Sequence, residues 1–203
     1  MLWLMNSTSR LRAMKHFAQI YTGQPFTGSD EERELIMIML TNSQGSVGLE
    51  EALCEIMNLK QTVTKHGFDA VDQKTNIQYE LKPSMLFTPK AQYNDVTEKK
   101  IAELKSCENR LVFETHIDGR MIFLAEISGK FIVQILEEKY LARKNKIALG
   151  KCKGTRQSHG ITINNIVNRF GKQHVKILRY VPHAKFSKTT KKLLNLSVEI
   201  NNL

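Results

Sequence analysis

Acidic residues are missing from a long stretch in the second half of this 203-residue chain. Between Lys139 and Lys192 there are 15 Lys and Arg residues and no Asp or Glu, whereas residues 1–100 carry 11 basic and 12 acidic side chains. The net charge of +10 therefore comes from the second half of the chain. Such an asymmetry predicts a polyanionic partner that is held by the C-terminal half.

Cysteines and long apolar runs are also scarce. No run of about 18 apolar residues occurs, which argues against a membrane-spanning helix and predicts a protein with no membrane partner. The three cysteines, Cys54, Cys107 and Cys152, are far apart and form no CxxC motif. Their spacing argues against a disulfide framework and gives little support to a structural zinc site. We therefore expect a reducing, cytoplasmic compartment.

The spacing of apolar residues predicts helices first, and then strands and helices together. Predicted helices cover residues 9–21, a stretch after the capping-box sequence at 29–32, residues 46–57, a short segment after Thr97, and residues 131–144. Predicted strands cover residues 63–72, 77–82, 111–113, 121–124 and 174–181, while 161–166 fits either state and 188–192 fits a turn. This order predicts a mixed α/β or α+β fold with a central mixed sheet flanked by helices.

One predicted hairpin separates its polar residues from its apolar ones. If the chain reverses between Lys74 and Thr75, paired residues have numbers that sum to 149, and Asp69 lies opposite Glu80. Because side chains alternate along a strand, Asp69, Glu80 and Lys82 then share one face. The other face receives an apolar set that fits a core: Phe68, Ala70, Tyr79 and Leu81. A loop with an odd number of residues would instead give the acidic position to Asp72.

Two carboxylates at this spacing have Cβ atoms about 5 Å apart and repel each other unless a cation lies between them. Hard oxygen ligands without a thiolate favour Mg²⁺ or Mn²⁺ over zinc. A lysine beside such a metal can orient or deprotonate a water molecule, or stabilise developing negative charge. These groups therefore suit metal-assisted hydrolysis of a phosphodiester. The alternative interpretation is a solvated hairpin with an ordinary glutamate and lysine face.

Asp69, followed by Glu80-Leu81-Lys82 on the next strand, resembles the Asp…(Asp/Glu)-x-Lys core of the restriction-endonuclease-like nucleases, the PD-(D/E)xK superfamily. The resemblance covers residues 46–124: a helix, the hairpin, a second helix and further strands. It implies that Asp69 and Glu80 bind a divalent metal together with the backbone carbonyl of Leu81. It also implies that Lys82 acts on the attacking water.

Many members of this family add a glutamate from the preceding helix, and the match here is Glu50 or Glu51. We favour Glu50, which lies at the edge of the apolar stripe formed by residues 49, 53, 56 and 57, whereas Glu51 falls on the opposite side. The chain departs from the family pattern at Phe68, where the family often has proline.

The resemblance implies a Mg²⁺-dependent DNA endonuclease, with Mn²⁺ as a substitute, that leaves 5′-phosphate ends. At this size it implies a compact type II restriction enzyme that acts on double-stranded DNA as a homodimer, in a prokaryotic or phage setting. Two alternatives stay open: a phage or repair nuclease, such as a junction resolvase or homing endonuclease, and a non-catalytic DNA-binding protein. Within a single nuclease domain, we expect a helical part (1–45), a catalytic core (46–130) and a basic DNA-binding part (131–203).

The basic stretch holds the candidate DNA-binding residues. Lysines in loops that contain glycine can follow a phosphate backbone without reading bases, whereas Arg, Asn and Gln side chains can bind base edges. The candidates for phosphate contact are Lys144, Lys146, Lys151 and Lys153. The candidates for base contact are Arg156, Gln157, His159, Asn164, Asn165 and Arg169. For any one of them, the alternative is that it covers a surface or bonds to the loop backbone.

Overall fold

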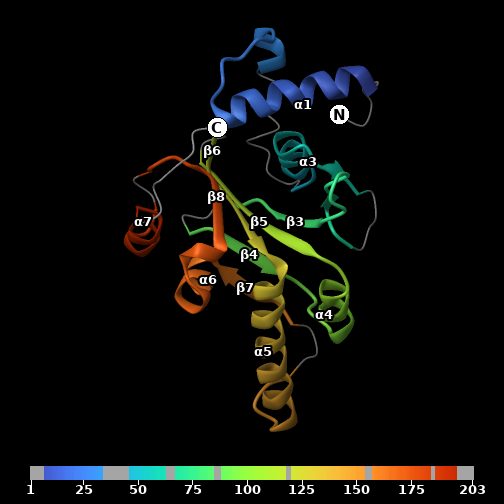
Figure 1. Cartoon of the computed structure of the whole chain (residues 1–203), viewed down its shortest axis with the longest axis vertical. Coiled ribbons are helices and arrows are strands. Elements are labelled where there is room, and N and C mark those ends of the chain that lie inside the picture. The colour runs from blue at the N-terminus through green and yellow to red at the C-terminus, as the bar shows by residue number, and fades with distance from the viewer. Residues whose placement is uncertain are drawn as a thin grey trace.

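A mixed β-sheet forms the centre of the molecule. The computed structural model describes residues 7–33, 46–62, 67–84, 88–117, 120–153, 157–183 and 186–195. Within these ranges, one six-stranded sheet has the order β1-β2-β3-β5-β6-β8 (Figure 1). Its strands are β1 Lys60–Gln61, β2 Ala70–Val71, β3 Gln78–Lys82, β5 Asn109–Ile117, β6 Arg120–Ser128 and β8 Val175–Tyr180. Strands β3 and β5 are parallel and the other neighbours are antiparallel, so the predicted mixed α/β class is confirmed.

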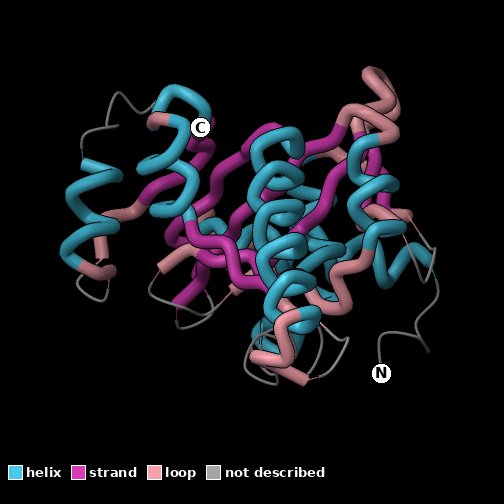
Figure 2. Tube along the Cα trace, turned by 90° about the horizontal axis from the view of Figure 1, so that it is seen from below, coloured by secondary structure: helices cyan, strands magenta, loops and turns pink. Residues whose placement is uncertain are grey.

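Helices cover both faces of this sheet (Figure 2). They are α1 Ser7–Thr22, α3 Ser46–Met57, α4 Glu98–Lys105, α5 Gly129–Ala148, α6 Ile163–Phe170 and α7 Lys188–Asn195, with a 3₁₀ turn at Lys172–His174. On one face, Phe17 of α1 and Leu53 of α3 form a core with Leu81 of β3. On the other face, residues of α4, α5 and α6 form a second core with Phe113 and Phe123 of the sheet. Burial of both faces is what a parallel strand pair with a helical crossover requires.

Strands β4 (Lys90–Tyr93) and β7 (His159–Thr162) form a separate antiparallel pair. Ala91 and Ile161, one from each strand, are buried in the second core, so the pair packs on the same side as α4 and α5. The segment 161–166, which fits either state by sequence, divides between β7 and α6. The division falls at Thr162, which caps α6 through a capping box with Asn165. Strand β4 is not among the predicted strands.

The register of the hairpin between β2 and β3 is confirmed. Ala70 pairs with Tyr79 and Val71 pairs with Gln78, so the paired numbers sum to 149. Strand β2 is short, and it begins only at Ala70. The predicted alternation therefore does not extend to Phe68, which packs against the second core and not with Ala70 and Tyr79 in the first.

Other differences concern the ends of elements. Residues 188–192, predicted as a turn, lie in α7, where the Ser187 hydroxyl accepts a 3.1 Å hydrogen bond from the Thr190 backbone N–H. The predicted strand over 63–72 is reduced to β2, and residues 63–66 lie outside the described residues. The predicted capping box is confirmed by reciprocal hydrogen bonds of 2.8 and 3.2 Å between Ser29 and Glu32.

Candidate active site

The turn between β2 and β3 is held by Asp72. Its side chain accepts a 2.8 Å hydrogen bond from the Lys74 backbone N–H, and its carbonyl accepts one of 2.8 Å from the Asn76 N–H. Asn76 has the left-handed conformation, with φ at 58°, that asparagine tolerates in turns. The hydrogen bond from Lys74 lowers the pKa of the Asp72 carboxyl. Asp72 therefore serves the turn, and the acidic position opposite β3 falls to Asp69.

Three charged side chains of the hairpin meet on one face, and we call Asp69, Glu80 and Lys82 the hairpin cluster. Lys82 Nζ lies 2.8 Å from Glu80 Oε1 and 3.4 Å from Asp69 Oδ2. The Leu81 backbone N–H donates a 2.7 Å hydrogen bond to the same Asp69 oxygen. This hydrogen bond fixes the Asp69 carboxylate across the hairpin, next to the residues of β3.

The Lys82 ammonium is held in its charged form. Burial lowers the pKa of Lys82, but the neighbouring carboxylates of Glu80 and Asp69 outweigh burial and raise it above its usual value. Glu80 is 5% exposed, and a second ammonium, Lys100 Nζ, lies 3.9 Å from its Oε1. The charge of this buried carboxylate is therefore compensated. At neutral pH Lys82 is a hydrogen-bond donor and a source of positive charge.

Two cavities reach the hairpin cluster. One has a volume of about 410 Å³ and is lined by Lys82 and its neighbours, by a residue of α3, and by residues in and just after β4: Leu81, Pro83, Ser84, Glu50, Lys90, Gln92 and Asn94. The other has a volume of about 200 Å³ and is lined by Glu80 and by residues before β2 and in or just after α4: Gly67, Phe68, Lys100, Glu103, Leu104 and Ser106. The hairpin cluster is therefore accessible to a ligand, although Glu80 itself is buried.

The helix glutamate that faces the hairpin cluster is Glu50. It lines the larger of the two cavities with Lys82, and its charge helps to raise the pKa of Lys82. Glu51 is not among the described residues that line this cavity. Cys54 is buried in the same helix; burial, followed by the charges of Asp69 and the two glutamates, raises the pKa of its thiol to about 12. The thiol is therefore protonated at neutral pH.

The donors of the hairpin cluster fit a hard divalent cation. One oxygen each of Asp69 and Glu80 already lies within 3.4 Å of a single cationic nitrogen. Carboxylate oxygens are the ligands that Mg²⁺ and Mn²⁺ prefer. Within the described ranges, no group of three or more His, Cys, Asp or Glu side chains lies close enough to hold a metal ion. A metal here would need the Leu81 carbonyl or Glu50 in addition to the two acids.

Several candidate DNA-binding residues have partners within the protein. Lys144 of α5 forms a 2.8 Å ion pair with Glu98, and Arg169 of α6 forms a bidentate pair with Glu138. Asn165 completes the capping box of α6. These contacts explain the three side chains without DNA, although the lysine and arginine pairs lie at the surface, where phosphate can compete with the glutamates.

Gln157 and His159 contact each other, with Gln157 Oε1 lying 3.1 Å from His159 Nε2, and Gln157 is buried. Burial, together with the charges of Lys139 and Arg143, lowers the pKa of His159, so its imidazole is neutral at neutral pH. Helix α5 extends well beyond the sheet in Figure 1. The remaining candidates are the exposed Lys146, Lys151 and Lys153 around the end of α5, the half-buried Asn164, and Arg156, which lies outside the described residues.

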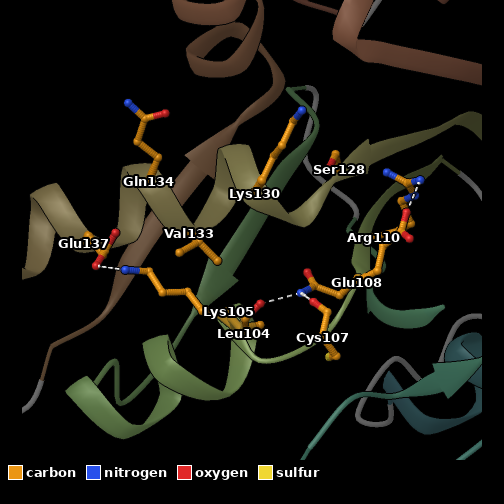
Figure 3. A pocket seen from close by; sticks show the side chains of 11 residues that line it. Leu104, Lys105, Cys107, Glu108, Arg110, Ser128, Lys130, Val133, Gln134 and Glu137 are labelled. Atoms are coloured by element: carbon orange, nitrogen blue, oxygen red, sulfur yellow. Dashed lines mark hydrogen bonds and ion pairs between the residues drawn. The ribbon is translucent and has the colours of Figure 1, made fainter. Parts of the chain in front are cut away.

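A larger cavity, of about 600 Å³, lies between α4, the start of β5 and α5 (Figure 3). Figure 3 shows Lys105 and Glu137 pointing toward one another, with Lys105 Nζ 2.5 Å from Glu137 Oε1. The side chains of Arg110 and Glu108 form a second pair at 2.8 Å. Each acidic residue that lines this cavity is therefore paired with a basic one. The convergence of two acids on one lysine places the candidate site at the hairpin cluster instead.

Lys100 and the polar residues in and just after β4 are not among the predicted site residues. The sequence around each of them predicts only its secondary structure. Lys90, Gln92 and Asn94 alternate with buried residues over five positions, which is the period of a half-buried strand. Lys100 lies in the first turn of α4, three residues after the cap Thr97. The approach of this lysine to Glu80 depends on how α4 packs against the hairpin.

Comparison with known proteins adds no family to this description. No protein-family model matches the chain, and no curated protein matches its sequence. Among the helices that the structure describes, none is long and apolar enough to cross a membrane. The functional interpretation therefore rests on the geometry of the hairpin cluster and its surroundings.

Proposed function

We propose that the protein is a metal-dependent endonuclease that hydrolyses phosphodiester bonds of double-stranded DNA. The observation that carries the proposal is the convergence of the Asp69 and Glu80 carboxylates on the Lys82 ammonium, at 3.4 and 2.8 Å. The hairpin follows α3, and β4, α4 and β5 come after it. Apart from β4, this matches the order of helix, hairpin, helix and strands that the PD-(D/E)xK resemblance implies. Charged groups beside a cavity suit phosphoryl transfer, in which catalysis is mostly positioning and charge stabilisation.

Each member of the hairpin cluster has a role in this proposal. Asp69 and Glu80 would hold a Mg²⁺ or Mn²⁺ ion, with the Leu81 carbonyl or Glu50 as a further ligand. When bound, the ion supplies Lewis-acid stabilisation of the charge that develops on the scissile phosphate. Lys82 stays protonated, donates a hydrogen bond that orients the attacking water, and stabilises negative charge. In-line displacement leaves a 5′-phosphate and a 3′-hydroxyl, as the family resemblance implies.

The basic second half supports duplex DNA as the substrate. Lys146, Lys151 and Lys153 are exposed around the end of α5, where lysines can contact phosphates without reading bases. Within this class we favour a sequence-specific type II restriction enzyme of a prokaryotic or phage host. It would act as a homodimer, because two hairpin clusters are needed to cut both strands in one encounter.

The second candidate function is a non-catalytic DNA-binding protein. The ion pairs of the hairpin favour it: Glu80 lies beside two ammonium groups, Lys82 and Lys100, so its charge is compensated without a metal. In that case the hairpin is part of the scaffold, and DNA binding is indifferent to Mg²⁺. A phage or repair nuclease differs from the first proposal only in the DNA structure that it selects.

Incubation of plasmid and phage DNA with the wild type and Lys82→Ala, with and without Mg²⁺, separates these candidates. Discrete fragments that require both the metal and Lys82 support a sequence-specific endonuclease. Cutting that is confined to branched DNA favours a junction-resolving nuclease. Intact DNA throughout contradicts the enzyme proposal. The matched control is Lys130→Ala, which removes one exposed positive charge at the 600 Å³ cavity.

A further inference from the structure

Strand β4 and Asn94, the residue after it, present a row of polar side chains beside the hairpin cluster. The cavity of about 410 Å³ that Lys82 lines is also lined by Lys90, Gln92 and Asn94. The alternate residue Tyr93 is buried, and so is Ala91. Gln92 and Asn94 are exposed. Strand β4 therefore turns one face to the core and the other to the space in front of the hairpin cluster.

Tyr93 fixes β4 to the hairpin cluster. Its side chain is 2% exposed, and the centre of its ring lies 6.0 Å from Lys82 Nζ. Burial, together with the two hairpin carboxylates, raises the pKa of its hydroxyl, so Tyr93 stays neutral. Tyr93 stands between Gln92 and Asn94, the residue that follows β4, and both amides line the same cavity as Lys82.

The partner strand β7 leaves room for these side chains. Gln92 pairs with Gly160, and we call this two-stranded element the β4–β7 ribbon. A Cβ at Gly160 would collide with the Lys90 side chain and lie 3.3 Å from Gln92 Oε1. The side chains of Lys90 and Gln92 thus pass over Gly160, through the space that a side chain at position 160 would occupy. Lys139 of α5 donates a 2.7 Å hydrogen bond to the Gly160 carbonyl, which supports the ribbon from α5.

We propose that the polar face of the β4–β7 ribbon reads the base sequence of double-stranded DNA beside the cut. This inference rests on the nuclease function proposed above. A two-stranded β-ribbon fits the major groove of B-DNA. Glutamine and asparagine amides bind adenine through two hydrogen bonds, and a lysine ammonium binds phosphate or guanine. Lys90 then positions the DNA, and Gln92 and Asn94 discriminate between bases.

Three of the candidate base-contact residues in the second half of the chain are less available to bind bases. Gln157 is buried, Asn165 completes a helix cap, and Arg169 is paired with a glutamate. Gln92 and Asn94, by contrast, are exposed and line the cavity of the hairpin cluster. Reading by β4 would also couple recognition to cutting, because the Tyr93 ring of the same strand lies 6.0 Å from Lys82 Nζ.

The test is a selection on a library of randomised DNA duplexes with the wild type, Gln92→Ala, Asn94→Ala and the control Gln134→Ala. Gln134 is an exposed amide of α5 at the 600 Å³ cavity. Cut sites are sequenced after reaction with Mg²⁺, and bound duplexes are sequenced after selection in EDTA. We expect the wild type and Gln134→Ala to share one preferred sequence. Gln92→Ala and Asn94→Ala should lose roughly 10- to 100-fold of discrimination at one or two positions.

A second variant, Gln92→Glu, separates base reading from folding. It keeps the side-chain length and replaces the NH₂ donor by an acceptor, so we expect a preference for adenine to change to one for cytosine. Melting temperatures of all variants control for folding, and a substitution at these exposed positions should change them little.

The outcomes distinguish this inference from the function on which it rests. If Gln92→Ala and Asn94→Ala keep the wild-type preference, or if the wild type cuts all sequences equally, the ribbon does not read DNA and the nuclease proposal stands. If the wild type binds with a preference that depends on Gln92 and never cuts, the ribbon reads DNA, but the nuclease proposal is wrong and no cut lies beside the sequence that is read. If the wild type binds no duplex, both are wrong.

Discussion

Glu80 and Glu114 are buried carboxylates on the neighbouring strands β3 and β5, but they lie on opposite faces of the central sheet and have different partners. Glu80 contacts the ammonium of Lys82 at 2.8 Å. Glu114 accepts a 2.5 Å hydrogen bond from the Tyr21 hydroxyl and lies 3.0 Å from His116 Nδ1. We call Tyr21, Glu114 and His116 the core cluster. One carboxylate has a cationic partner, whereas the other has a phenol and an imidazole.

The two clusters also differ in access and in protonation. Glu114 is 0% exposed, and burial raises the pKa of its carboxyl despite the hydrogen bonds that it receives. Burial likewise raises the pKa of Tyr21. Lys82 and Glu80 instead line cavities, and their opposite charges stabilise each other. Burial alone therefore does not mark a functional carboxylate. A compensated charge beside an accessible cavity is the better sign.

Removal of the Lys82 ammonium from the hairpin cluster should have the largest effect on DNA cleavage. We expect Lys82→Ala to lower the single-turnover rate of Mg²⁺-dependent DNA cleavage about 100-fold or more, because the donor that orients water and stabilises charge is lost. Lys100→Ala removes a cation that lies 3.9 Å from the same carboxylate, and we expect a loss below about 10-fold. Rates on one duplex check this order. Equal rates for Lys82→Ala and the wild type would contradict the role of Lys82.

Metal binding should stabilise the protein through the hairpin cluster and not through other acids. At about 100 times its Kd, Mg²⁺ should add about 2.7 kcal/mol to the free energy of unfolding, which calorimetry detects as a higher melting temperature. We expect Asp69→Asn to lose most of this increase, because a charged donor is removed. Asp72→Asn makes the same change in the turn and should keep the increase. An increase that survives Asp69→Asn would place the ion elsewhere.

The exposed lysines around the end of α5 should contribute to the binding of duplex DNA through phosphate contacts. Alanine at Lys146, Lys151 and Lys153 should weaken duplex binding and reduce the slope of log K against log salt by about 2.7, since each phosphate contact contributes about 0.9. Lys144 is already paired with Glu98, so Lys144→Ala should change the slope by less than about 0.9. Fluorescence titrations without Mg²⁺ measure both. A slope unchanged in the triple variant would show that other residues hold the phosphates.

The smallest effect is expected in the core cluster, where it concerns stability and its pH dependence. The pKa of Glu114 is raised above its usual value of 4.5 in the folded protein. Between these two values the folded protein holds a proton that the unfolded chain has lost, so stability falls as the pH rises through this window. Glu114→Gln removes this titration. Its melting temperature, measured relative to that of the wild type, should therefore increase with pH above 4.5.

The Glu114 carboxylate is faced by three groups: the Tyr21 hydroxyl, the His116 ring and the Ser84 backbone N–H. A second variant therefore has to separate the titration of Glu114 from the loss of a hydrogen bond. Tyr21→Phe removes one hydrogen-bond donor and keeps the carboxyl. It should lower the melting temperature and retain the wild-type trend with pH. A constant offset between Glu114→Gln and the wild type across pH would show that Glu114 does not titrate in this range.

The local part of the candidate site could be predicted from the sequence. The segregation of polar and apolar residues predicts the register of Ala70 with Tyr79 and Val71 with Gln78. Asp69, just before β2, and Glu80 both lie close to Lys82. The cap at Thr97 likewise predicts α4. These features depend on residues that are close in the chain, where the periods of strand and helix determine the direction of each side chain.

The parts that depend on packing could not be predicted in the same way. The core cluster joins Tyr21 to Glu114 across 93 positions. The basic stretch contains no acid, yet Lys144 has Glu98 as its partner, because α4 packs beside α5. The approach of Lys100 to Glu80 has the same origin. A run of one charge in the sequence is therefore not a run of unpaired charges on the surface.

The most direct test makes one substitution in both clusters and measures one rate. Glu80→Gln and Glu114→Gln each replace a buried carboxyl by an amide of the same shape. On duplex DNA with Mg²⁺, we predict that Glu114→Gln cuts within about 3-fold of the wild type while Glu80→Gln is slower by about 100-fold or more. A wild-type rate for Glu80→Gln would contradict the assignment of the hairpin cluster as a nuclease site.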